Sequence, residues 1–296
     1  MNPVALYFAS GESLYPGAAL LLFAVATSPC LKRRWLVPLR NVTAWLALAM
    51  VVMACPPFAW SADAIFLAVF LLWFVASNRR APGQTWMRAR VVTTITLALL
   101  LVLLTAVEVT HRAMPQVTGV LSDHLVVIGD SISSGIDPRV PAWPSVLQRI
   151  TGVPVKNLSR PGTQVIEGPS MAETVTSEDR IVLIEIGGND LLSGVPADAF
   201  EQGLEATLAK VAAPGRTVVM FELPLLPHKI AYGQIQRRLA AKYGVWLIPK
   251  RYFIDVIGGA NSTSDGLHLS DAGARRMAAL VAQVLSPALQ RRSANP

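Results

Sequence analysis

One short stretch decides the fold of the second part of this chain: His124-Leu125-Val126-Val127-Ile128-Gly129-Asp130-Ser131. The run 124–128 is almost wholly apolar and too short for a helix, which predicts a buried strand. The Gly-Asp-Ser that follows is polar and turn-forming, so the strand is expected to end there. The stretch therefore places a serine hydroxyl directly after a buried strand.

The same alternation continues outward from this stretch. Further strands are predicted at 153–158, 181–186, 217–222 and 245–248, and helices at 142–150, 196–213, 229–243 and 270–289, the last with Ser270 as its N-cap. Strands that are nearly continuous runs of Val, Ile and Leu, with helices between them, indicate a parallel sheet covered on both faces. The predicted fold class is α/β.

Polar residues follow the predicted strands at their carboxyl ends. The first strand ends in Gly129–Ser131, the second near Asn157–Gly162, and the third in Gly187–Asp190. A fourth polar group, Asp265–His268, lies in the loop before the last helix. Sites in parallel sheets form at the carboxyl edge, so we expect these four loops to converge.

The residue types at this edge suit acyl transfer, which needs a nucleophile, a base, an orienting group and donors for an oxyanion. Ser131 supplies a hydroxyl. Of the four histidines, His111, His124, His228 and His268, the last has a carboxylate three residues before it within a polar loop, whereas the Glu108 that precedes His111 by three residues belongs to an apolar run. In a turn, that spacing lets Asp265 reach the Nδ1 atom of His268 and leaves Nε2 for the serine. Asn189 and the backbone of Gly162 can donate to an oxyanion.

Each of these residues also has an ordinary structural interpretation. Ser131 and Asn189 could cap helices, Asp265-Gly266 could be a simple turn, and His268 could be a surface residue. Taken together, the structural interpretations require four coincidences at one edge of the sheet. Trp143 could border the site or only pack in the core.

These residues resemble the GDSL/SGNH hydrolase family. Gly129-Asp130-Ser131-Ile132-Ser133 is similar to its first block, Gly162 to the glycine of its second, Gly187-Gly188-Asn189-Asp190 to its third, and Asp265-x-x-His268 to its last, over roughly residues 124–288. The resemblance implies a flavodoxin-like three-layer α/β/α fold. It implies Ser131 as nucleophile, His268 as base and Asp265 as the residue that orients it. It also implies an oxyanion hole formed by the backbone N–H groups of Ser131 and Gly162 and the side-chain amide of Asn189.

The sequence favours no cofactor and no metal. It has no Gly-x-Gly-x-x-Gly after a strand, no Walker A loop and no His-Glu-x-x-His. The two cysteines, Cys30 and Cys55, both lie in the apolar N-terminal part, so no disulfide framework is expected in the second part.

The first 110 residues have a different composition. They hold 11 of the 45 charged residues and four apolar runs, Leu14–Leu31, Val42–Trp60, Ala64–Ser77 and Val91–Val109. Runs of this kind predict about four transmembrane helices, although the first is interrupted by Pro29 and the third is short. The alternative is a buried helical core of a soluble protein. We expect a membrane region over 1–112 and an SGNH-type hydrolase domain over 113–296.

The basic residues suggest an orientation. Lys and Arg number 0, 4, 0, 4 and 1 in the successive segments outside the runs. Basic loops stay cytoplasmic, so the N-terminus and everything after residue 110 are expected outside the cytoplasm. The charge is net +5 in residues 1–110 (8 basic, 3 acidic) and only +2 in the remainder (18 basic, 16 acidic), which argues against nucleic-acid binding.

The sequence thus predicts a multi-pass protein of the cell (inner) membrane whose extracytoplasmic or periplasmic domain is a serine esterase. Its expected partners are the lipid bilayer and an ester of the cell envelope, first an O-acetyl ester on carbohydrate. Alternatives are O-acyl transfer to an envelope glycan, a lysophospholipase or other lipid esterase and, from another class, a non-catalytic membrane scaffold.

Overall fold

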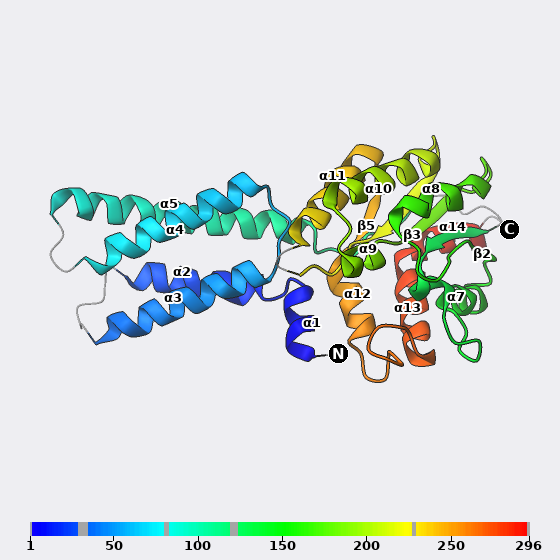
Figure 1. The fold of residues 1–296 in the computed structure, drawn as a ribbon, viewed down its shortest axis with the longest axis horizontal. Coiled ribbons are helices and arrows are strands. Elements are labelled where there is room, and N and C mark those ends of the chain that lie inside the picture. The colour runs from blue at the N-terminus through cyan, green and yellow to red at the C-terminus, as the bar shows by residue number, and fades with distance from the viewer. Residues whose placement is uncertain (1, 29–34, 80–82, 119–123, 227–228, 295–296) are drawn as a thin grey trace. The chain divides into compact units, whose positions relative to one another are not determined.

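The computed structural model describes residues 2–28, 35–79, 83–118, 124–226 and 229–294. The chain divides into two compact units. One consists mainly of the residues after Arg112, and the other of Tyr7–Arg112 (Figure 1). Cys30, Lys32–Arg34, Arg80 and His228, to which the sequence drew attention, lie outside the described residues.

The C-terminal unit is built on a five-stranded parallel sheet. Its strands are β1 (Leu125–Gly129), β2 (Val155–Asn157), β3 (Ile181–Glu185), β4 (Thr217–Phe221) and β5 (Trp246–Ile248). They are ordered β2-β1-β3-β4-β5, with Val127 opposite Asn157 on one side and Leu183 on the other. This is the flavodoxin-like order, and it confirms the predicted fold.

Helices cover both faces of the sheet. They are α6 (Ser131–Ser134), α7 (Trp143–Thr151), α8 (Gly168–Met171), α9 (Gly188–Ser193), α10 (Ala197–Val211), α11 (Ile230–Tyr243), α12 (Lys250–Ile257), α13 (Asp271–Val284) and α14 (Ser286–Ala294), with 3-10 turns η1 (Val165–Glu167) and η2 (Ala172–Thr174). Figure 1 shows α10 and α11 on one side of the sheet and α12 and α13 on the other. Phe200, Leu204 and Leu208, spaced by four residues along α10, are fully buried, as expected for a helix that packs one apolar stripe on a sheet.

The last predicted helix is divided into two. α13 begins after Ser270, whose hydroxyl accepts a hydrogen bond from the N–H of Gly273 at 3.2 Å, so the predicted N-cap is confirmed. The helix ends at Val284, and α14 begins at Ser286. Pro287 is the reason, because proline lacks an N–H and is tolerated only in the first turn of a helix.

The N-terminal unit is helical. Its elements are α2 (Leu14–Thr27), α3 (Leu36–Met53), α4 (Trp60–Asn78) and α5 (Gln84–Thr110), together with the end of α1 (Pro3–Ala9), whose first residues are grouped with the C-terminal unit. Three of them, α3, α4 and α5, are long and apolar enough to cross a membrane. The first predicted run differs from the expectation: α2 has 14 residues, about 21 Å of helix, and meets α1 at a bend of 78°. Gly11, with φ +81°, lies in the break. A fourth span exists only if this bent pair is counted as one.

The helices of this unit are apolar on the inside and on the outside. Leu21, Ala44, Phe70 and Leu97 are among the residues that form a buried core. Large apolar side chains also cover the outer faces, among them Phe23, Leu46, Leu72, Leu99 and Leu103. Helices that are apolar all round are typical of a membrane or of a core inside a larger protein.

Candidate active site

Ser131 is placed by a tight junction between β1 and α6. A side chain at Gly129 would lie 2.6 Å from the Cβ of Ser133 and 2.9 Å from the carbonyl of Glu185, so only glycine fits there. Asp130 is the N-cap of α6, and its carboxylate accepts the N–H of Ile132 at 2.9 Å. Ser131 is therefore the first residue of the helix, at the carboxyl edge of the sheet.

Asp265 and His268 lie in the turn before α13. The Asp265 carboxylate accepts the N–H groups of Leu267 at 2.9 Å and His268 at 2.8 Å, and its Oδ2 lies 2.6 Å from Nδ1 of His268. Gly266, with φ +90°, gives the turn a conformation that other residues rarely adopt. The hydrogen bonds from His268 and Leu267 hold the pKa of Asp265 well below its usual range, so this carboxylate is charged at neutral pH.

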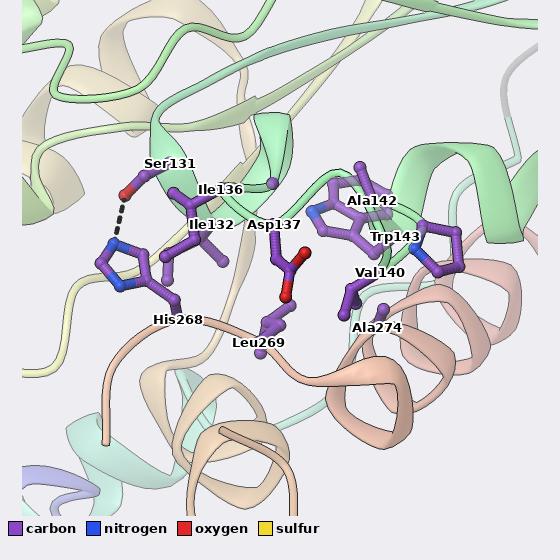
Figure 2. Close-up of a pocket in the computed structure, with 12 residues that line it drawn as sticks. Ser131, Ile132, Ile136, Asp137, Val140, Ala142, Trp143, His268, Leu269 and Ala274 are labelled. Atoms are coloured by element: carbon purple, nitrogen blue, oxygen red, sulfur yellow. Dashed lines mark hydrogen bonds between the residues drawn. The ribbon is translucent and has the colours of Figure 1, made fainter. Parts of the chain in front are cut away.

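The imidazole joins the two loops. Nε2 of His268 lies 3.1 Å from the Oγ of Ser131, the contact dashed in Figure 2. With Asp265 accepting the proton on Nδ1, Nε2 has a lone pair for the serine hydroxyl. The three residues that the sequence singled out from segments more than 130 positions apart thus form one continuous chain of hydrogen bonds. His124, in contrast, pairs with Asp179 at the other end of β1.

The expected oxyanion donors lie near Asp130 and the segment after β2. Gly162 has φ +75°. Within the described part of the chain, neither its N–H nor that of Ser131 has an acceptor. The Nδ2 atom of Asn189 donates to the Thr163 carbonyl at 3.0 Å and to the Oδ2 of Asp130 at 3.3 Å. Asn189 therefore adjoins the loop that carries Gly162, but its amide protons already have protein acceptors.

A buried acid, Glu185, lies behind the nucleophile and was not singled out from the sequence. It ends β3, it is 4% exposed, and its Oε2 accepts the hydroxyl of Ser133 at 2.6 Å. The same hydroxyl oxygen accepts the indole N–H of Trp143 at 3.1 Å. Burial first, and then the charge of Asp130, raises the pKa of Glu185 well above its usual value. A single carboxylate inside the otherwise apolar run 181–186 was the signal that could have identified it.

Asp130 has an altered pKa for the same main reason. Burial raises its pKa to about 6, against the opposing effect of the hydrogen bond from Ile132. Two carboxyl groups thus lie buried behind the nucleophile, and burial favours the neutral form of both.

A pocket opens beside Ser131 and His268. It is lined by Ser131, Ile132, Gly135, Ile136, Asp137, Val140, Pro141, Ala142, Trp143, His268, Leu269 and Ala274. Figure 2 shows Ile132 and Ile136 next to Ser131, with Val140, Trp143 and Leu269 further along. Trp143 does both things considered from the sequence, because it borders the pocket and is fully buried. In the described segments, no group of three or more His, Cys, Asp or Glu side chains could hold a metal ion.

Comparison with known proteins relates this unit to a family of hydrolases. The GDSL-like lipase/acylhydrolase family matches residues 127–276. The Esterase TesA of Pseudomonas aeruginosa is 29% identical over 181 residues, which is 56% of this chain and 89% of that protein. The Arylesterase of Vibrio mimicus is 30% identical over 184 residues, 55% of this chain and 88% of its own length. A crystal structure of TesA matches 56% of this chain and 99% of that one, with a TM-score of 0.49 and 29% identity.

Proposed function

Because the chain belongs to the GDSL-like lipase/acylhydrolase family and is an ester-hydrolysing serine hydrolase, we propose that Ser131, His268 and Asp265 are its catalytic triad. One observation carries this proposal: the ring of His268 lies between the Ser131 hydroxyl, at 3.1 Å, and the Asp265 carboxylate, at 2.6 Å. Each ring nitrogen faces the group that the mechanism requires.

The geometry supports the usual two half-reactions of acyl transfer. The Oγ of Ser131 attacks the ester carbonyl carbon while Nε2 of His268 takes its proton. The tetrahedral intermediate collapses, the alcohol leaves with the proton from Nε2, and an acyl-serine remains. Water then attacks the acyl group, with His268 again as the base, and releases the acid and free Ser131. Asp265 stays ionised and stabilises the imidazolium.

We assign the oxyanion to three donors: the N–H groups of Ser131 and Gly162 and the Nδ2 of Asn189. The two backbone groups have no acceptor among the residues that the structure describes, so they can donate at no cost. Asn189 must exchange a bond. The contact with Asp130 at 3.3 Å is longer than the one with Thr163 at 3.0 Å, so the proton facing Asp130 is the one that turns to the oxyanion.

We further propose that residues 1–112 anchor the enzyme in the cell membrane and that residues 113–296 are its extracytoplasmic hydrolase domain. The support is the length and apolar character of α3, α4 and α5 and the apolar outer faces of the unit. Exposed tryptophans occur near the helix starts, Trp35 before α3 and Trp60 at the start of α4, where membrane interfaces favour them. The alternation of basic loops supports the orientation.

The substrate that we propose is an acyl ester of the cell envelope, with an O-acetyl ester on carbohydrate as the first candidate and a lysophospholipid as the second. The extracytoplasmic location would bring envelope glycans and lipids within reach. The apolar side chains of Ile132, Ile136 and Leu269 beside Ser131 suit the acyl part of an ester.

Replacement of the nucleophile tests this function. Ser131→Ala should lower ester turnover by the full-length protein on the order of 10³-fold or more. Ser134→Ala is the matched control, because this serine lies on the same short helix and, among the described residues, its hydroxyl donates only to the Gly135 carbonyl, at 3.3 Å. Near-normal turnover by Ser131→Ala would refute the triad. A panel of acetylated glycans and lysophospholipids would then identify the alcohol part, and ester formed on an added glycan acceptor would indicate transfer instead of hydrolysis.

A further inference from the structure

The charges of the N-terminal unit are segregated to opposite ends. Its three acidic residues, Glu12, Asp63 and Glu108, lie just before α2, in the first turn of α4 and in the last turns of α5. The basic residues up to position 110 that the structure describes are Arg40, Arg79, Arg88 and Arg90, and they lie near the other ends of these helices. Asp63 and Asn78, at the two ends of α4, are about 22 Å apart along the helix. Among the residues of this unit that the structure describes, the basic end therefore has no acidic side chain.

Two arginines at this end converge on one residue. Arg40 of α3 donates to the Oγ of Ser28 at 3.1 Å, and Arg90 of α5 donates to the carbonyl of Ser28 and to its Oγ at 3.3 Å. The remaining acceptors of Arg40 are neutral: the Oδ1 atoms of Asn41, at 2.7 and 3.1 Å, and Asn78, at 3.0 Å, and the Ser77 carbonyl, at 3.4 Å. Arg40 is only 6% exposed, so its charge is buried, and no carboxylate in the described part of the chain pairs with it.

The two guanidinium groups differ in how many of their N–H groups are still available to a ligand. Every N–H of Arg40 has an acceptor in this set. Arg90 uses only its Nη2, so among the described residues its Nε and Nη1 have no acceptor, and the side chain is half-buried. The Nε and one Nη of an arginine form the edge that binds a phosphate with two parallel hydrogen bonds.

Unsatisfied polar atoms lie next to this layer. Trp73 is fully buried, and among the described residues its indole N–H has no hydrogen-bond partner; the buried hydroxyls of Ser77 and Thr94 have none there either. Trp73 is one turn from Ser77 on α4, and Thr94 is one turn from Arg90 on α5. The Cζ of Arg40 lies 5.9 Å from the centre of a Trp73 ring. All three orphan groups can donate a hydrogen bond, and none is acidic.

We propose that the end of the helical unit around Ser28, Arg40 and Arg90 binds the phosphate of an anionic phospholipid headgroup. Among the described residues, the two cations have no counter-ion and the three donors have no partner, and each donor belongs to this contact set or lies one helical turn from a member of it. Together they form a site for an anion. The occupant is a lipid because the site ends a bundle whose outer faces are apolar, so a bound headgroup leaves its acyl chains beside those faces. The inference rests on the proposed membrane anchoring and, with the proposed orientation, places the site in the cytoplasmic leaflet.

The test uses the full chain purified in a non-ionic detergent. Phosphatidylglycerol should raise the midpoint of thermal unfolding by about 5 °C at saturation, while phosphatidylcholine of the same chain length should have little effect. Arg90→Gln should weaken phosphatidylglycerol binding about tenfold or more. Arg88→Gln is the matched control: it removes the same charge from the same helix end, but Arg88 is exposed and outside this contact set. Equal effects of the two lipids, or of the two variants, would overturn the proposal, and a full shift with inorganic phosphate alone would overturn the lipid assignment.

A second variant keeps the test informative if Arg90→Gln folds poorly. Thr94→Val removes an unpaired hydroxyl at nearly constant volume, so without lipid it should leave the unfolding midpoint unchanged or raise it. With phosphatidylglycerol it should bind more weakly than the unsubstituted chain, and unchanged binding would count against the site. Failure of the membrane anchoring gives a different result, a chain that stays in solution without detergent. Turnover of a water-soluble ester, measured on the same samples, reports on the triad independently.

Discussion

Glu185 gives the most specific prediction for the C-terminal unit, because its burial favours the neutral form of the carboxyl group. Two replacements separate its charge from its shape. Glu185→Gln keeps an oxygen that can accept the Ser133 hydroxyl now held at 2.6 Å. Burial raises the pKa of Glu185 well above its usual value and so favours the neutral form, which glutamine resembles. The glutamine should therefore cost no more than about 1 kcal/mol at pH 7.

Glu185→Ala removes the acceptor and leaves a void. The Ser133 hydroxyl, which holds the buried indole N–H of Trp143 at 3.1 Å, then has no acceptor from β3. An unmet buried hydroxyl costs about 1–3 kcal/mol, and the cavity adds a further ~1 kcal/mol. We expect a loss of about 3 kcal/mol, or about 6–12 °C in the midpoint of heat inactivation. The assay is residual ester turnover by the full chain after heating, because it reports on the C-terminal unit.

The pH dependence of stability tests whether folding raises the pKa of Glu185 or lowers it. A carboxyl group whose pKa is raised by folding takes up a proton when the chain folds, so its contribution is lost as the pH rises through the raised pKa. Glu185→Gln cannot ionise and should gain stability relative to the native chain as the pH increases toward alkaline values. If the glutamine variant were as damaged as the alanine variant at pH 7, Glu185 would be a charged residue and the reasoning would be wrong.

Three further predictions concern the same site. Asp265→Asn should lower turnover at least on the order of 10²-fold while the chain stays folded, because the amide no longer fixes the tautomer of His268; unchanged turnover would remove Asp265 from the triad. Burial raises the pKa of Asp130 from 3.8 to about 6. The free energy of unfolding should therefore fall by up to about 3 kcal/mol as the pH rises through 6. Unfolding of Asp130→Asn should lack this dependence, and an identical pH profile would contradict the assignment. Gly129→Ala should destabilise the unit by about 1–3 kcal/mol, since its methyl group would lie 2.6 Å from Ser133; wild-type heat resistance would show that the junction is less tight than described.

The sequence predicted the sheet because its strands are short, apolar and bounded by polar turns. Each of the five strands lies within two residues of the predicted range. The division of the last helix was missed although Pro287 marked it, because the apolar pattern continues beyond the proline. α12 was not predicted because it is a short amphipathic segment that follows β5 almost directly, without a loop that would mark its start in the sequence.

The site was predicted in its residue types but not in all its contacts. A Ser, an Asp-x-x-His and an Asn after successive strands identify the participants, since the carboxyl edge of a parallel sheet collects them. The contacts of Asn189 with Thr163 and Asp130, and the burial of Glu185 against the Ser133 hydroxyl, depend on packing between residues far apart in sequence. The bend between α1 and α2 was likewise not predicted, because the apolar character of a run indicates that the segment is buried away from water and does not indicate whether its helix is straight.

The most direct test of the central claim is covalent labelling of the full chain with a fluorophosphonate, followed by mass mapping of the modified residue. The account predicts one label on Ser131 that is lost in His268→Ala and unaffected in Ser134→Ala. Labelling of His268→Ala at the native rate, or a label on another residue, would show that this imidazole does not activate this hydroxyl.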